Sequence, residues 1–224
     1  MVPVASDKAD ASAEPPVGQR RRRADAVRNR ALVLAAAEDV FAESGSKAQI
    51  EEIARRAGVG VGTVCRNFPT KEALLEAVFT GLYESLLERA RLALAVPDPS
   101  LAFEQFLVSL PEFHVKHRAF AEQMANELEV AAQPVRDQLM AAITELVTRA
   151  QAAGAIRRDI GPADVSMLLS GVAHATALAG DLQPMLRERY VRIILDGLRT
   201  RGSELPGRPV SFAELRRAKQ RRAK

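Results

Sequence analysis

The sequence predicts an all-α protein of about nine helices, arranged in two unequal regions. Alanine, leucine, arginine and glutamate dominate the 224 residues, whereas aromatic residues make up only 4%. This composition favours helices over β-sandwiches and barrels. Apolar residues recur at helical spacing along most of the chain. Prolines and glycines stand where those helices would begin and end.

The first predicted helix runs from about Ala24 to Ser44. Its apolar residues follow one helical face, and Gly45 supplies a stop signal directly after it. The residues on this face are Val33, Ala36, Ala37, Val40 and Phe41. Residues 1–19, before this helix, contain three prolines and show no periodicity. We therefore expect a disordered N-terminal tail there.

Two short helices are predicted next, at residues 50–57 and 61–67, with a turn at Gly58 between them. The first has glutamates in its first turn and arginines in its last, as the helix dipole prefers, but Lys47, Ala48 and Gln49 offer it no good cap. We expect one apolar seam to hold the pair, made of Ile53, Val59, Val64 and Phe68. Two short helices in this order form a helix-turn-helix, whose second helix lies in the major groove of DNA.

Longer helices are predicted after Pro69. Thr70 can cap a fourth helix that closes at Pro97 and Pro99. Its apolar stripe is Leu75, Val78, Phe79, Leu82 and Leu86. Beyond Pro99 the same reasoning predicts helices at about 101–117, interrupted at Pro111, and at 118–130, 134–153, 162–179 and 184–200.

The run IEEIARRAGVGVGTVCRNFPTKEALLEAVF, preceded by ALVLAAAEDVFAESG, resembles the DNA-binding region of the tetracycline-repressor (TetR) family of regulators. The resemblance is continuous from about Ala24 to Phe79, so we assign residues 20–79 to a DNA-binding domain with a basic arm. It implies that the DNA-contacting positions are Val61, Gly62, Thr63, Cys65, Asn67 and Lys71. By their chemistry, Thr63 and Lys71 suit phosphate oxygens, as does Arg66. Asn67 suits an adenine edge, and Val61 suits a thymine methyl group.

Two positions depart from the pattern of the family. Cys65, the only cysteine, stands where the family usually has a tyrosine whose hydroxyl contacts phosphate, and Asn67 stands where it often has a histidine. The cysteine removes a hydrogen-bond donor and contact area. Phosphate anchoring is therefore expected to depend more on Thr63, Lys71 and the basic arm.

Positive charge is concentrated near the two ends of the chain, although the net charge is only +4. The arm consists of Arg20, Arg21, Arg22 and Arg23, directly before the first predicted helix. We expect it to reach an adjacent minor groove. Residues 203–224 form a second basic segment, and the sequence leaves open whether this tail is a frayed helix or disordered and what it does.

The resemblance implies that residues 80–202 form a helical ligand-binding and dimerisation domain. Its last two main helices, 162–179 and 184–200, would build a four-helix bundle with a second subunit. They carry apolar residues on more than one face, namely Val165, Leu168, Leu169, Val172 and Thr176 in the first and Leu186, Tyr190, Ile193 and Ile194 in the second. A homodimer predicts a near-palindromic double-stranded DNA operator. The function expected is a repressor that an unidentified small-molecule effector releases from DNA.

Aromatic residues, methionines and histidines of the middle helices are the candidates for the ligand site. They are Phe103, Phe106, Phe113, His117, Phe120, Met124, Met140 and His174. Each of the aromatic residues and methionines also suits a place in the hydrophobic core. Where they line a pocket instead, its mixture of side chains suits a moderately apolar molecule.

The sequence also bears on other functions. No nucleophile–base set, phosphate loop or carboxylate pair appears, so neither an enzyme nor a cofactor is expected. His114 and His117 share a helix face but lack further ligands for a metal. One cysteine cannot form an internal disulfide, which fits the cytoplasm, and a redox-responsive regulator using Cys65 is the alternative reading. No apolar run reaches the roughly 20 residues of a membrane helix, so no membrane partner is expected.

Overall fold

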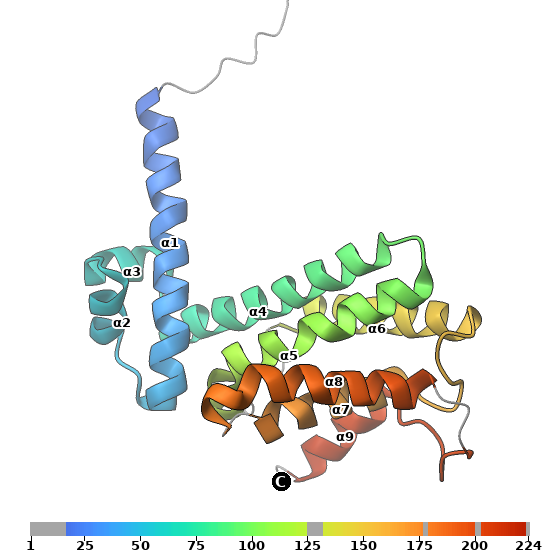
Figure 1. The fold of residues 1–224 in the computed structure, drawn as a ribbon. Helices are drawn as coiled ribbons and strands as arrows, with labels where there is room; N and C mark the ends of the chain where they lie inside the picture. The colour runs from blue at the N-terminus through green and yellow to red at the C-terminus, as the bar shows by residue number, and fades with distance from the viewer. Residues whose placement is uncertain (1–16, 125–131, 177–178, 200–202, 223–224) are drawn as a thin grey trace, which may run out of the picture.

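The structure, a computed structural model, describes residues 17–124, 132–176, 179–199 and 203–222. Within these ranges every regular element is a helix. Figure 1 shows two regions: α1, α2 and α3 stand together, and α4 leads from them into a bundle completed by α5 to α9. The predicted all-α class, with a small N-terminal region and a larger second one, is confirmed. None of the described helices is long and apolar enough to cross a membrane.

The N-terminal region consists of α1 (Val17–Ser44), the 3-10 turn η1 (Gly45–Lys47), α2 (Ile50–Ala57) and α3 (Val61–Asn67). It has its own hydrophobic core, in which the predicted face of α1 meets α2, α3 and the start of α4. The first helix begins at Val17 rather than at Ala24. The arginines expected before the helix are therefore part of it, because arginine and alanine both favour helix. Of the tail expected at 1–19, residues 1–16 lie outside the described ranges.

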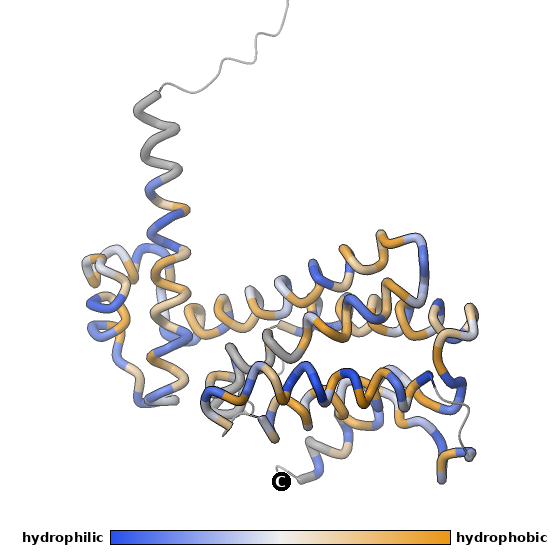
Figure 2. The backbone as a smooth tube through the Cα atoms, in the orientation of Figure 1, coloured by the Kyte–Doolittle hydropathy of each residue, from blue (hydrophilic) through white to orange (hydrophobic). Residues whose placement is uncertain are grey.

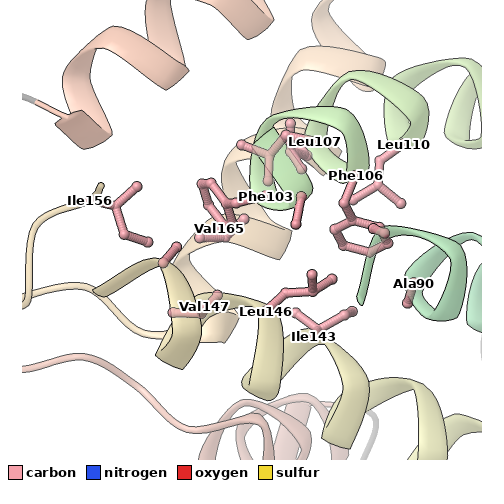
Figure 3. Packing of buried hydrophobic residues seen from close by; sticks show 14 of the residues in the cluster. Ala90, Phe103, Phe106, Leu107, Leu110, Ile143, Leu146, Val147, Ile156 and Val165 are labelled. Atoms are coloured by element: carbon pink, nitrogen blue, oxygen red, sulfur yellow. The ribbon is translucent and has the colours of Figure 1, made fainter. Parts of the chain in front are cut away.

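The second region consists of α4 (Lys71–Leu94), α5 (Pro99–Met124), α6 (Gln133–Ala152), α7 (Pro162–Thr176), the 3-10 turn η2 (Gly180–Leu182), α8 (Gln183–Arg199) and α9 (Phe212–Arg222). Figure 3 shows the centre of its core, where Phe103, Phe106 and Leu107 of α5 face Ile143 and Leu146 of α6. The predicted starts at Pro134, Pro162 and Pro184 each agree within one residue. Thr70 caps α4, since its hydroxyl accepts the Ala73 N–H at 3.0 Å, and Gln49 makes no side-chain cap for α2, as expected.

The interruption predicted at Pro111 is wrong, because α5 continues through it to Met124. Proline removes one backbone donor from a helix and usually kinks it. Here the flanking residues Leu107, Leu110 and Phe113 are buried against the rest of the protein, and this packing holds the segment helical. The Ser109 hydroxyl also donates to the Phe106 carbonyl at 2.7 Å.

Helix α8 carries apolar residues on its buried face and on its outward face. Val191, Leu195 and Leu198 are buried, whereas Tyr190 and Ile193 are exposed. In Figure 2 hydrophobic and hydrophilic residues alternate along α8, in agreement with a helix that carries apolar residues on two faces. The neighbouring α7 does the same, with Leu169 buried and Leu168 exposed.

Candidate DNA-binding surface and ligand cavity

A tight turn sets the angle between α2 and α3. Gly58 takes the left-handed conformation with φ 66°, and the Val59 N–H donates to the Ala54 carbonyl at 3.0 Å. Such a turn favours glycine because it has no Cβ. The predicted seam forms, with Ile53, Val64 and Phe68 buried and Val59 packed against them. The turn and the seam fix the orientation of α3.

Ion pairs add a polar clamp between α1 and α2. Arg56 Nη1 donates to Glu43 Oε1 of α1 at 2.6 Å, and Arg56 Nε donates to Glu52 Oε1 at 2.7 Å. Hydrogen bonds from Arg55 and Arg56 lower the pKa of Glu52 to about 2. The clamp therefore carries its charges throughout the neutral range, where it holds α2 against α1.

The recognition helix α3 exposes most of the positions expected to contact DNA. Val61, Gly62, Cys65 and Arg66 are exposed, Thr63 and Asn67 are half-buried, and Val64 is buried. Val64 anchors this short helix in the core of the N-terminal region. Its outer face is free for a major groove, which accommodates an α-helix.

Four of the predicted contact residues, Thr63, Arg66, Asn67 and Lys71, have hydrogen-bond partners within the chain. The Asn67 Nδ2 donates to the Thr63 carbonyl at 2.8 Å, and Arg66 Nη2 donates to the Thr63 hydroxyl at 3.1 Å. Lys71 Nζ donates to the Ser46 carbonyl at 2.6 Å. Asn67 must turn away from its own helix to read a base, and Lys71 also fastens the start of α4 to η1.

Arg30 of α1 is a neighbour of the recognition helix that the sequence analysis did not single out. Its guanidinium lies 4.5 Å from the centre of the Phe68 ring, directly after α3, in cation–π distance. The basic composition of this stretch is a signal, but the contact depends on how α1 crosses α3. Arg30 adds a cation at one end of the DNA-facing helix.

The basic arm is helical and projects from the domain. From Asp25 on, where burial is described, Val33 is the first buried residue of α1, and Figure 1 shows the N-terminal half of α1 extending beyond α2 and α3. Of residues 17–24 the structure describes the helical backbone but not the side chains. An α-helix is about 10–12 Å wide and the minor groove of B-DNA about 6 Å. The helical arm is therefore wider than a minor groove. This disagrees with the sequence-based expectation that the arm reaches into one.

A cavity of about 290 Å³ lies within the second region. Five helices contribute to its lining, and α9, from the segment predicted only as a basic tail, is one of them. The lining consists of Tyr83 and Leu86 of α4, Phe106 and Leu110 of α5, Arg136, Asp137, Leu139, Met140 and Ile143 of α6, Ser166, Met167 and Ser170 of α7, and Phe212 and Leu215 of α9.

Of the eight predicted ligand residues, Phe106 and Met140 line this cavity. Phe103 lies in the neighbouring core and His174 is exposed on α7, while the side chain of Met124 lies outside the described part of the chain. Periodicity places a residue on a helical face, but the neighbouring helix determines whether that face meets a cavity. This is why Tyr83, Arg136 and Phe212 were not predicted.

The other three predicted ligand residues lie between the two regions. The ring of Phe113 is 4.4 Å from that of His117, and His117 pairs with Glu38 of α1. Phe120 is buried in the N-terminal core, 4.6 Å from the Phe79 ring and 6.3 Å from the Phe41 ring. Across the described residues, no group of three histidine, cysteine or acidic side chains is placed to hold a metal.

Two family profiles match the chain in separate segments. Residues 33–78 match bacterial regulatory proteins of the tetR family, and residues 98–200 match the C-terminal domain of SbtR-like transcriptional regulators. Together they cover part of α1, all of α2 and α3, the start of α4, and α5 to α8.

Characterised and solved proteins agree with these profiles. The HTH-type transcriptional regulator UidR of Escherichia coli is 28% identical over 188 residues, which span 76% of this chain and 93% of UidR. The TetR transcription regulatory protein of Mycobacterium vanbaalenii is 38% identical, with a TM-score of 0.60 over 80% of this chain and 99% of that one. A TetR transcriptional regulator of Streptomyces coelicolor is 34% identical, with the same TM-score, over 77% and 99%.

Proposed function

Since the chain belongs to the TetR family of transcriptional regulators and carries their DNA-binding helix-turn-helix, we propose that it is a repressor. It binds a near-palindromic operator as a homodimer, and a small molecule bound in the second region releases it. The observation that carries the proposal is that α4 and α5 each extend from the core of the DNA-binding region to the ligand cavity.

Recognition of the operator rests on the exposed face of α3. Val61 is placed to touch a thymine methyl group, Thr63 and Arg66 to meet phosphate oxygens, and Asn67 to pair with an adenine edge. Gly62 lets the backbone approach the DNA closely. Cys65 occupies the centre of this face with a small side chain.

The arm contributes phosphate contacts rather than minor-groove contacts. Arg20, Arg21, Arg22 and Arg23 follow one another in a projecting helix, so together they span nearly a full helical turn. A helix of this kind lies along the phosphate backbone beside the half-site. Each phosphate it neutralises releases condensed counterions.

The dimer interface is the outward face of α7 and α8. Leu168, Tyr190 and Ile193 are apolar and exposed there. Gly171 and Gly197 lie on the same helices, and a Cβ built at either would meet no atom within 4 Å. Packing within one chain therefore does not require these glycines, whereas a close approach of two helices from two subunits does.

Ligand release follows from the two shared helices. In α4, Leu74 and Val78 belong to the DNA-binding core and Tyr83 and Leu86 line the cavity, a few residues further on. In α5, Leu110 lines the cavity and Phe120 belongs to the DNA-binding core. A ligand that prefers one arrangement of these helices shifts the population of DNA-binding dimers.

Selection of bound fragments from genomic DNA, followed by footprinting, tests this function. Recovered sites with two-fold symmetry and half-sites about one helical turn apart are expected. Compounds would then be screened for release of the protein from that site. Sites without two-fold symmetry would overturn the homodimer, and an absence of specific sites would overturn the repressor.

A further inference from the structure

The chain beyond α8 returns to the body of the protein as a folded strap, residues 203–222. The loop between α6 and α7 holds its beginning. Arg157 Nη2 donates to the Ser203 carbonyl at 2.8 Å, and the Leu205 N–H donates to Asp159 Oδ2 at 3.1 Å. Arg157 and Asp159 also pair with each other at 2.6 Å, and this guanidinium holds the pKa of Asp159 well below its usual range.

A second point of attachment lies at Gly161, at the start of α7. A Cβ built on Gly161 would stand 2.9 Å from the Cβ of Pro209 in the strap. Two carbon atoms do not approach so closely without a shift, since their optimal separation is about 3.5–4.0 Å. The strap therefore packs on this loop at a distance that only glycine permits.

Helix α9 begins with a turn that its own residues stabilise. The Ser211 N–H donates to Glu214 Oε2 at 3.0 Å, and the Glu214 N–H donates to the Ser211 hydroxyl at 3.2 Å. This reciprocal pair is a capping box. Arg208 pairs with Glu214 and lowers the pKa of that carboxyl to about 2. The turn presents Phe212 and Leu215 to the cavity.

Helix α9 is attached to the body through this first turn. Phe212 packs against the main core and lines the cavity together with Leu215. Arg217, Ala218 and Arg221, further along the helix, are exposed. Among the described side chains of α9, Phe212 and Leu215 make the apolar contacts to the body, and a wall attached in this way can open locally while the helices behind it stay folded.

We propose that α9 is the movable wall of the ligand cavity. It opens about residues 203–210 and closes over an effector, with Phe212 and Leu215 against the bound molecule. The proposal rests on the proposed function in taking this cavity as the effector site. The fixed part of the lining is largely apolar, and its polar groups are the Tyr83 hydroxyl, Arg136, Asp137, Ser166 and Ser170. It suits a compact, mainly apolar molecule with one hydrogen-bonding end.

Thiol labelling measures the opening without a ligand. In a Cys65→Ser background, an Ile143→Cys variant places one thiol in the lining of the cavity. A Val147→Cys variant places it one turn further along α6, in the closed core. Both native side chains are buried. The reagent is 5,5′-dithiobis(2-nitrobenzoate), and the rate of release of its chromophore is recorded for the full-length protein.

The thiol at position 143 is expected to react about tenfold faster than that at 147, because local opening is more frequent than global unfolding. Gly161→Ala, which pushes Pro209 away, should accelerate only the reaction at 143. Gly81→Ala is the matched control, since a Cβ there meets no atom within 4 Å. Equal rates at 143 and 147 that Gly161→Ala leaves unchanged would overturn the movable wall.

A second variant covers the case in which Gly161→Ala loosens the whole domain and raises both rates. Phe212→Ala with Leu215→Ala leaves Gly161 in place and should again accelerate only position 143. Unequal acceleration supports the wall, and equal acceleration overturns it. Operator affinity is measured in a separate experiment. If no operator is found, the proposed function is wrong, but the labelling rates still decide whether α9 moves.

Discussion

His117 of α5 pairs through Nδ1 with Oε1 of Glu38 in α1, and so joins the second region to the N-terminal region. The two side chains are only 12% and 18% exposed. Three residues further on, Phe120 inserts into the DNA-binding core. The C-terminal end of α5 is therefore packed against α1, while Leu110 of the same helix lines the cavity.

A double-mutant cycle of His117→Ala and Glu38→Ala measures the coupling energy of this pair. Each substitution alone is expected to lower the free energy of unfolding by about 1–3 kcal/mol, because it leaves a largely buried polar partner unpaired. The double variant should cost little more than one single change. Urea denaturation gives the three values. If the costs of the single changes simply add, the pair does not couple the regions.

Two phenylalanines of α5, Phe120 and Phe106, differ in their surroundings, and replacing each by alanine compares the loss of stability in a closed core with the loss beside a cavity. Phe120→Ala is expected to destabilise the protein by about 3–5 kcal/mol, because it empties a site inside the DNA-binding core. Phe106→Ala enlarges an existing cavity and should cost less. Thermal and urea unfolding of both variants provide the comparison, and an equal cost would contradict the placement of Phe106 at the cavity.

Phe106 and Phe120 show which features of the site can be predicted from the sequence. Both are apolar at helical spacing, so the pattern correctly places them inside a helical protein and cannot say which helix each one meets. The two helices of the helix-turn-helix were predictable to the residue because their turn and their apolar seam are both local. The cavity was not, because α4, α5, α6, α7 and α9 come from distant parts of the sequence, and α9 looked like a basic tail. The resemblance predicts Lys71 as a DNA contact, whereas its bond to the Ser46 carbonyl depends on how the start of α4 lies against η1.

Cys65→Tyr is expected to tighten operator binding about tenfold, the effect of one added hydrogen bond to a charged phosphate. Sequence preference should stay the same, because a phosphate contact carries no base information. Fluorescence anisotropy with operator and mismatched duplexes measures both quantities, and Cys65→Ser is the control for loss of the thiol alone. Weaker binding by the tyrosine variant would count against this placement of residue 65.

The same duplexes test the redox alternative. Peroxide is expected to leave wild-type affinity unchanged, because the chain holds only one cysteine and cannot close an internal disulfide. Peroxide-dependent release that Cys65→Ser abolishes would instead identify Cys65 as a redox sensor.

Gly197→Glu is expected to convert the dimer to monomers. It would bury an unpaired carboxylate between two subunits, at a cost of several kcal/mol. Gly81→Glu is the matched control, because Gly81 is also an exposed helical glycine with open space around it, in α4. Sedimentation velocity separates the two species. A dimeric Gly197→Glu variant would place the interface elsewhere.

Replacement of Arg20, Arg21, Arg22 and Arg23 by alanine tests how the arm meets DNA. Four consecutive residues of a helix point in nearly all directions, so about two of them can face one phosphate strand. The slope of log K against log salt concentration should therefore become shallower by roughly 2, at about 0.9 per phosphate. Alanine keeps the segment helical, which separates lost charge from lost structure.

The control for this experiment is a pair of exposed arginines in α9, Arg217→Ala with Arg221→Ala, which should leave the slope unchanged. Flanking sequence decides between the two modes of contact. A helix too wide for the minor groove cannot sense its width, so A·T-rich and G·C-rich flanks should bind equally well. A preference for A·T-rich flanks that disappears with the arginines would mean that the arm unwinds and enters the groove, as the sequence alone suggested.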